Sequence, residues 1–186
     1  MLDDIMVYLL PLLIGLVGYL LCFRSKQSPG EKKKNEETVQ NYELPPVTIA
    51  ANHIVLNDNF ELPDENRAAL ELLAKHATII LLVEVKDQEE ADRRTAPLQE
   101  IFDGIVNPDY ILFCQTAYGR GSMSRQLEAV THIDYDPEAV IQTASFHPSV
   151  LIAPDTVKCE KAKWRSTSLS EFLSKGNTDF YSLFNQ

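Results

Sequence analysis

The chain has 186 residues, of which 45% are hydrophobic and 24% charged, with 17 Lys and Arg against 27 Asp and Glu. This size and composition fit one modest globular domain with an additional segment. The net charge of −10 argues against a nucleic-acid partner, because binding of phosphates requires clustered Lys and Arg. Cys22, Cys114 and Cys159 are widely spaced, so they indicate neither a disulfide framework nor a CxxC zinc site.

The N-terminus predicts a membrane span. Residues 5–23, IMVYLLPLLIGLVGYLLCF, carry no charge, and as a helix they would rise about 28 Å, close to the thickness of the hydrocarbon core. A cleaved signal peptide is the alternative, but Asp3 and Asp4 stand where a signal has basic residues, and no small-residue cleavage site follows. Basic residues follow the span at 24, 26 and 32–34. We therefore expect residues 1–23 to form a single-pass anchor, with the rest of the chain in the cytosol.

A polar linker is expected next, over residues 24–46. Its sequence, RSKQSPGEKKKNEETVQNYELPP, holds little that could enter a hydrophobic core. Such a segment tethers a domain near a membrane and leaves it free to reorient. The Pro45-Pro46 pair marks the predicted domain boundary.

Residues 47–186 predict an α/β domain, with 21 acidic and 12 basic side chains. Runs rich in β-branched residues predict strands, and several are almost entirely apolar, which is typical of a parallel sheet covered on both faces. The predicted strands span residues 47–56, 78–85, 110–115, 130–133 and 149–153. Strand and helix patterns alternate, so we expect a small Rossmann-like three-layer domain with a mainly parallel sheet.

The helices between these strands are predicted from caps and apolar spacing. Asp64 precedes a helix ending near residue 76, and the Asp136-Pro137 pair begins another. Residues 87–103 form a third, which we expect Pro97 to break or kink, and residues 121–128 suit about two turns. A short helix is expected after Ser168. The C-terminal aromatic residues suit either docking onto the sheet or a partner-binding patch: Trp164, Phe172, Phe180, Tyr181 and Phe184.

Residues 110–134 are the first candidate region for a functional site, because they predict a strand, a glycine-containing turn and a short helix in succession. A strand–turn–helix unit can hold a phosphate on backbone N–H groups, but Gly119-Arg120-Gly121-Ser122 matches neither GxGxxG nor the P-loop. A turn glycine chosen for backbone shape is the simpler interpretation. Cys114 lies in an apolar strand, where a buried thiol is more usual than a nucleophile.

His132, Asp134 and Asp136 suggest a metal cluster or the paired aspartates of a phosphotransferase. Strand alternation places His132 and Asp134 on one side, and Asp136 with them if the strand continues that far, whereas Asp136 also suits the helix cap before Pro137. An aspartate-nucleophile enzyme needs its DxD after the first strand, but this DxD comes late. We therefore predict no catalytic, cofactor-binding or metal-binding residues, and a membrane-tethered domain that holds a protein partner. A membrane-tethered phosphatase or hydrolase using Asp134 and Asp136 is the alternative.

Residues 111–140, ILFCQTAYGRGSMSRQLEAVTHIDYDPEAV, resemble the signature region of the peroxisome assembly protein 22 (peroxin-22) family. The family elements are a strand ending in Phe-Cys, a Gly-Arg turn, Arg-Gln-Leu-Glu, and His-Ile-Asp. They match Phe113, Cys114, Thr116, Gly119, Arg120, Arg125, Gln126, Leu127, Glu128, His132, Ile133 and Asp134. These residues either shape the strand–turn–helix unit or contact a partner.

The resemblance implies a function and a location. A member of this family would be a single-pass protein of the peroxisomal (or related microbody) membrane that recruits, or recruits and activates, the peroxisomal ubiquitin-conjugating enzyme. Import receptors would then be ubiquitinated and recycled. The resemblance implies neither a catalytic activity nor a cofactor. The acidic domain would complement a basic patch on the enzyme.

Overall fold

The computed structural model describes residues 42–185. The predicted span, residues 1–23, lies outside these residues, as does most of the predicted linker, residues 24–46. In the part of the chain that the structure describes, no helix has both the length and the apolar character needed to cross a membrane. The described residues belong to one compact unit.

Six parallel strands form one sheet in the order β3-β2-β1-β4-β5-β6. This confirms the predicted parallel α/β architecture. The strands are β1 (Pro46–Ala50), β2 (Thr78–Glu84), β3 (Ile111–Cys114), β4 (Thr131–Asp134), β5 (Ser149–Ile152) and β6 (Trp164–Ser166). Strand β6 was not predicted, because its three residues form no apolar run and it is defined by its pairing with β5.

Strand β1 lies in the centre of the sheet, as expected for a mostly apolar segment. All five of its residues are buried, and Val47 pairs with Ile79 of β2 on one side and Thr131 of β4 on the other. Contacts with the sheet also precede residue 46. The backbone N–H of Thr78 donates to the Pro45 carbonyl at 3.1 Å, and the backbone N–H of Leu44 donates to the Thr78 hydroxyl at 3.3 Å.

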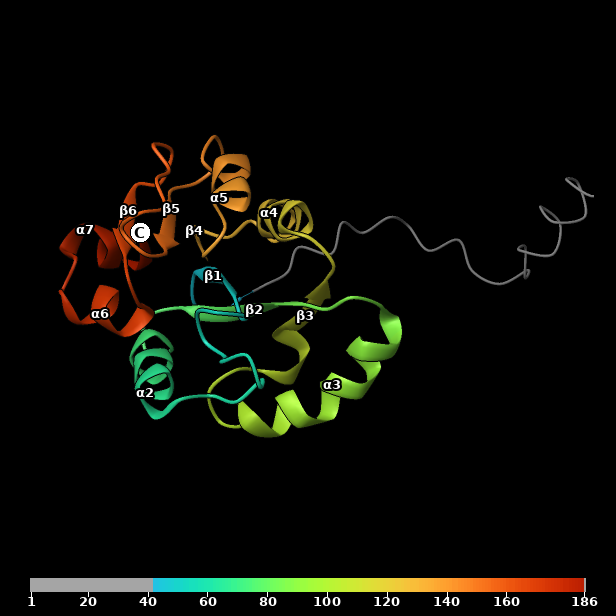
Figure 1. The fold of residues 1–186 in the computed structure, drawn as a ribbon. Coiled ribbons are helices and arrows are strands. Elements are labelled where there is room, and N and C mark those ends of the chain that lie inside the picture. The colour runs from blue at the N-terminus through green and yellow to red at the C-terminus, as the bar shows by residue number, and fades with distance from the viewer. Residues whose placement is uncertain (1–41, 186) are drawn as a thin grey trace, which may run out of the picture. The chain divides into compact units, whose positions relative to one another are not determined.

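Helices cover both faces of the sheet. Figure 1 shows α4 and α5 at the top of the view and α2 and α3 at the bottom, and α6 packs against α2. The helices are α2 (Asp64–Leu73), α3 (Gln88–Ile101), α4 (Ala117–Gln126), α5 (Pro137–Thr143), α6 (Leu169–Ser174) and α7 (Thr178–Tyr181), with 3-10 turns η1 (Pro108–Tyr110) and η2 (Ser182–Phe184). The three-layer arrangement matches the prediction.

Two helices differ from their predicted forms. Helix α3 continues through Pro97, which is exposed, so the carbonyl that loses its helical donor can bond to water. Helix α4 begins at Ala117 rather than Gly121, because the Thr116 hydroxyl accepts a hydrogen bond from the Gly119 N–H at 2.9 Å and caps the helix early. The predicted caps Asp136 and Ser168 are present.

The C-terminal aromatic residues belong to the core rather than to an exposed patch. Phe172, Phe180 and Phe184 are buried. Their rings meet edge to face, with centroids 4.8 Å apart for Phe172 and Phe180 and 5.2 Å apart for Phe180 and Phe184. The Trp164 ring of β6 lies 5.5 Å from the Phe180 ring. Docking is therefore the alternative that the structure confirms, and it covers the sheet on the α2 side.

Candidate functional site

The strand order reverses between β1 and β4, and this reversal defines the place to look for a site. Sequential strands run outward from β1 through β2 to β3, and from β4 through β5 to β6. In parallel α/β sheets, ligands bind at the carboxyl ends of the strands beside such a reversal. Strand β4 ends there with Asp134, and β2 ends with Glu84.

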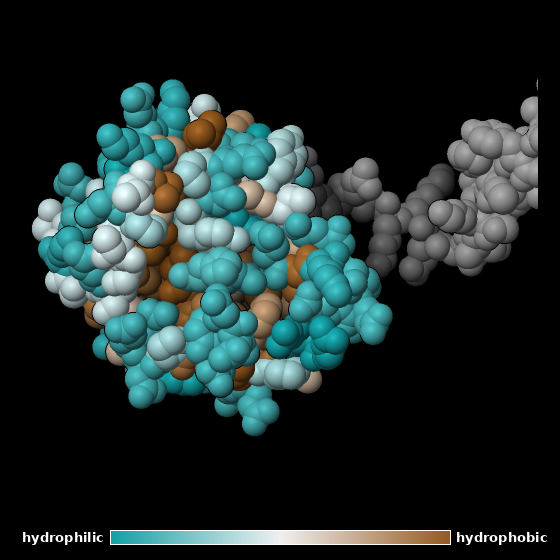
Figure 2. Space-filling model, viewed as in Figure 1, coloured by the Kyte–Doolittle hydropathy of each residue, from teal (hydrophilic) through white to brown (hydrophobic). Residues whose placement is uncertain are grey.

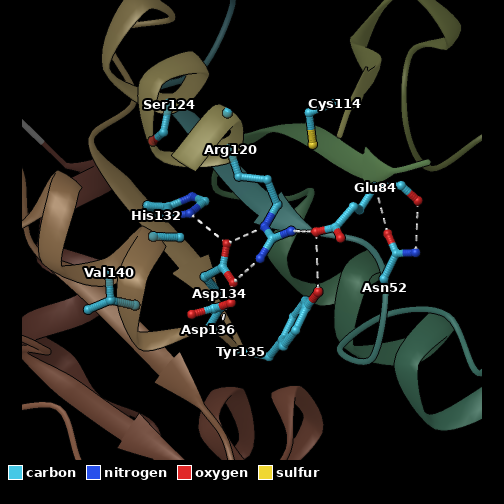
Figure 3. Close-up of polar contacts among 12 residues, drawn as sticks. Asn52, Glu84, Cys114, Arg120, Ser124, His132, Asp134, Tyr135, Asp136 and Val140 are labelled. Carbon is cyan, nitrogen blue, oxygen red and sulfur yellow. Dashed lines mark hydrogen bonds and ion pairs between the residues drawn. The ribbon is translucent and has the colours of Figure 1, made fainter. Parts of the chain in front are cut away.

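The carboxylate of Asp134 is fully buried and accepts four hydrogen bonds. Its Oδ2 accepts from Arg120 Nε at 2.7 Å and from His132 Nε2 at 3.0 Å. Its Oδ1 accepts from Arg120 Nη2 at 3.1 Å and from the Asp136 backbone N–H at 2.8 Å. Figure 3 shows the two side chains converging on it. A carboxylate offers about four lone-pair positions, so all of those on Asp134 are occupied.

Arg120 connects Asp134 to Glu84. Its guanidinium is fully buried, forms the bidentate pair with Asp134, and also donates from Nη1 to Glu84. The Tyr135 ring packs 4.7 Å from the guanidinium carbon, and the Tyr135 hydroxyl donates to Glu84 at 3.4 Å. A guanidinium thus occupies the carboxyl ends of the strands, the place where parallel α/β domains commonly bind a ligand.

Burial and hydrogen bonding have opposite effects on these charges. Burial alone would raise the pKa of Asp134, but hydrogen bonds from His132 and Arg120 outweigh it and hold that pKa below its ordinary value. Burial would lower the pKa of Arg120, yet pairing with Asp134 raises it. Both groups therefore remain charged at neutral pH. Burial also raises the pKa of Tyr135 to about 12, so its hydroxyl keeps its proton.

A chain of hydrogen bonds runs from Asp134 back beneath α4. His132 Nδ1 lies 2.9 Å from the Thr48 hydroxyl, which lies 2.6 Å from the Ser124 hydroxyl. The Ser124 hydroxyl lies 3.1 Å from His147 Nε2. Burial lowers the pKa of His147 to about 4, so this imidazole is neutral at physiological pH. The chain joins β1, β4, α4 and the loop after α5 through polar contacts.

The end of β1 holds an amide where an aspartate-nucleophile enzyme would need a carboxylate. The residues that follow β1 are Ala51, Asn52 and His53. The Asn52 side chain is already used, because Oδ1 accepts from the Glu84 N–H at 2.7 Å and Nδ2 donates to the Glu84 carbonyl at 3.1 Å. Asn52 therefore links the end of β2 to the turn after β1 through two hydrogen bonds.

The structure brings together only part of the predicted signature. Arg120, His132 and Asp134 form one cluster, as the strand alternation of the last two predicts. Ile133 points into the core on the other face of the sheet. Asp136 caps α5 by accepting from the Glu138 N–H at 2.9 Å, so the helix-cap interpretation is confirmed.

None of the remaining signature residues forms a hydrogen bond or an ion pair with the side chains of that cluster. Burial raises the pKa of Cys114 to about 11, which keeps its thiol protonated and a poor nucleophile. A Cβ at Gly119 would lie 3.3 Å from the Thr116 Oγ1, so glycine leaves room for the hydroxyl that caps α4. Phe113 packs partly buried against the core. Three more residues end α4 away from the cluster: Arg125, Gln126 and Leu127.

Sequence reasoning missed Thr48, Glu84, Ser124 and His147. Glu84 carried a usable signal, since it is a lone acid at the end of the apolar run TIILLVEV. Thr48, Ser124 and His147 carried no such signal, because a buried polar residue has the same appearance in a sequence as an exposed one. No group of three or more His, Cys, Asp or Glu within residues 42–185 is arranged to hold a metal ion.

The sheet order and the filled crevice define a class: a Rossmann-like α/β domain whose switch point is occupied by its own ion pair. A family model described as "Peroxisome biogenesis protein 22, Haloacid dehydrogenase-like domain" matches residues 38–173. The chain therefore belongs to the peroxisome biogenesis protein 22 family. It is also similar to "Peroxisome biogenesis protein 22" of Arabidopsis thaliana, with 36% identity over 107 residues. That match covers 54% of this chain and 38% of the relative.

Proposed function

We propose that this chain is a non-catalytic adaptor of the peroxisomal membrane that recruits the peroxisomal ubiquitin-conjugating enzyme. Membership in a peroxisome biogenesis family supports the organelle and the process. The charge-free stretch at residues 5–23, with its basic flank, supports a membrane tether. Holding the enzyme at the membrane raises its effective concentration near import receptors, which promotes their ubiquitination and recycling.

The saturated carboxylate of Asp134 is the observation that carries the non-catalytic part of the proposal. A nucleophile or a metal ligand needs a free lone pair, and Asp134 has each of its four positions occupied from within the chain. Arg120 would have to leave the crevice before a substrate could enter, and its own departure would leave Asp134 buried and unpaired. The same contacts make Asp134 a structural residue.

A binding titration tests the adaptor function directly. The full chain in lipid nanodiscs is titrated with the peroxisomal ubiquitin-conjugating enzyme of the same organism by calorimetry. A generic cytosolic ubiquitin-conjugating enzyme and empty nanodiscs are the controls. We expect selective one-to-one binding that weakens as salt rises, because the domain is acidic. Equal binding of both enzymes, or none, would overturn the proposal.

A separate assay addresses the alternative of a phosphatase or hydrolase. The wild-type chain and Asp136→Asn are incubated with a generic phosphomonoester, since Asn preserves the helix cap and hence the fold. The proposal expects no turnover above a buffer blank from either. Turnover by the wild type that falls in Asp136→Asn, with an unchanged thermal midpoint, would instead establish an enzyme.

A further inference from the structure

Large apolar side chains are concentrated on the outside of the α4–α5 layer. Phe146, Tyr118 and Ile141 are exposed by 64%, 60% and 53%. The other exposed large hydrophobic residues in the described part of the chain are Leu44 and Leu72, at 39% and 38%. Figure 2 shows mostly hydrophilic residues over the region of α2 and α3, a few hydrophobic ones at the upper edge near α5, and a hydrophobic area in the centre of the view between the two layers. Exposed aromatic side chains of this size mark interaction sites.

Tyr118 and Phe146 are linked through Arg125, and Ile141 lies on α5, which packs against α4. Helices α4 and α5 touch at Gly121, where an added Cβ would lie 3.2 Å from the Gln142 Cβ. Tyr118 and Arg125 are seven residues apart on α4, which places them on the same side two turns apart. The Arg125 guanidinium lies 4.8 Å from the Phe146 ring centroid, beyond the end of α5. We call Tyr118, Arg125, Ile141 and Phe146 the α4–α5 surface.

Charge is depleted around this surface. Residues 139–154 contain no Asp, Glu, Lys or Arg, and residues 111–127 contain only two arginines, of which Arg120 is buried. By contrast, α3 carries six charged residues among its fourteen. The acids Glu128 and Glu138 stand at the ends of the two depleted segments. An uncharged centre with aromatic and arginine side chains is the composition of a protein–protein interface core.

Arg125 gives this surface a charge preference. No carboxylate among residues 42–185 forms an ion pair with it, and its Nε has no hydrogen-bond acceptor there. The Phe146 ring holds the guanidinium in place, so little side-chain freedom is lost when a partner pairs with it. The matching group on a partner is a carboxylate beside apolar side chains.

We propose that the α4–α5 surface is where the protein partner docks, and that the partner presents apolar side chains next to a carboxylate. This inference rests on the proposed function, since the ubiquitin-conjugating enzyme is the partner used to test it. A lipid surface fits less well, because binding to anionic headgroups uses clusters of Lys and Arg and this surface has one cation, the partly buried Arg125. The face lies on the side of the sheet opposite α2 and α3.

The test combines variants with the nanodisc titration. Phe146→Ser and Ile141→Ser each remove an exposed apolar group, and we expect each to raise the Kd about tenfold. Arg125→Gln should raise the Kd less, because it removes one charged contact and leaves the apolar ones in place. Leu72→Ser on α2 is the matched control and should change the Kd less than about twofold. Thermal midpoints confirm that each variant is folded, and Tyr118→Ser replaces any that is not.

The outcomes separate this inference from the proposed function. Failure of the wild-type chain to bind the enzyme would overturn both. Wild-type affinity in all the surface variants would overturn the inference alone. Hydrogen exchange supplies a second measurement, because the enzyme should slow amide exchange at residues 117–126 and 137–147. Slowing of these residues without enzyme, by anionic lipid or by a second copy in the same nanodisc, would assign the surface to that occupant and overturn the proposal.

Discussion

The two faces of the sheet differ in the groups they bury and in the side chains their helices expose. Beneath α2 and α3 the core is apolar, with Val47 and Ile49 of β1 packed among leucine and aromatic side chains, while the outside of α3 is heavily charged. Beneath α4 and α5 a smaller apolar cluster around Val140 and Leu151 lies beside buried polar groups, including Thr48, Arg120 and His132, while the outside carries aromatic side chains and little charge.

The two faces therefore obtain their stability from different sources. Apolar burial on the α2–α3 face tolerates local change in proportion to the volume removed. The polar network on the α4–α5 face depends on every partner being present, because one orphaned charge costs more than a completed pair contributes. A rigid polar layer also holds α4 and α5 in a fixed pose, which suits a face that presents side chains to another protein.

The largest effect is expected from breaking the buried ion pair. Arg120→Met leaves Asp134 buried with its guanidinium partner removed, and should lower the free energy of unfolding by about 4 kcal/mol. Urea denaturation measures it. Adding Asp134→Leu should cost less than the sum of the two single variants, because the orphaned charge is then gone. A single-variant loss below about 1 kcal/mol would show that the polar face does not depend on this pair.

A somewhat smaller loss is expected on the apolar face. Leu70 is fully buried in the core beneath α2, and Leu70→Ala should lower the free energy of unfolding by about 3 kcal/mol. The loss should be insensitive to salt, since no charge is involved. Leu72→Ala, at a half-exposed position on the same helix, is the control and should cost clearly less. Similar losses for the two would contradict the assigned burial.

Acidification should weaken the polar face selectively. The pKa of His147 is about 4 in the folded chain and about 6.5 when unfolded, so the unfolded state binds the extra proton first. The neutral His147 therefore contributes to the free energy of unfolding at neutral pH, and this contribution is lost as pH falls through about 6.5 toward 4. After allowance for the partial exposure of His147, we expect the free energy of unfolding to fall by about 1 kcal/mol between pH 7 and pH 5. His147→Gln should flatten this part of the profile, and an unchanged slope would contradict the assignment.

The smallest effects should be the same on both faces. Asp87 caps α3 and Thr116 caps α4, each through one hydrogen bond at 2.9 Å to a backbone N–H three residues on. Asp87→Ala and Thr116→Ala should each cost about 1 kcal/mol in thermal or urea unfolding. Because a cap acts locally, the costs should agree although the layers beneath differ. A much larger loss for Thr116→Ala would mean that the cap also supports the polar network.

The sequence predicted the architecture better than it predicted the site. Strands such as β2 were visible because five successive residues, 79–83, are apolar, and caps such as Asp136 have a local signature. The pairing of Arg120 with Asp134 was not visible, because fourteen residues and a helix–strand connection separate them. Glu84 and His147 meet that network only through strand order, which periodicity does not encode.

The position of β1 has a consequence for how the chain folds. Its pairing with β2 joins residues about thirty apart, but its pairing with β4 joins Val47 to Thr131, more than eighty residues later. Contacts of such long range slow the search for the native topology. Until β4 has been synthesised, one edge of the apolar segment PVTIA has no neighbour and can pair with other chains. Nascent chains of this family are therefore expected to need protection over this interval of translation.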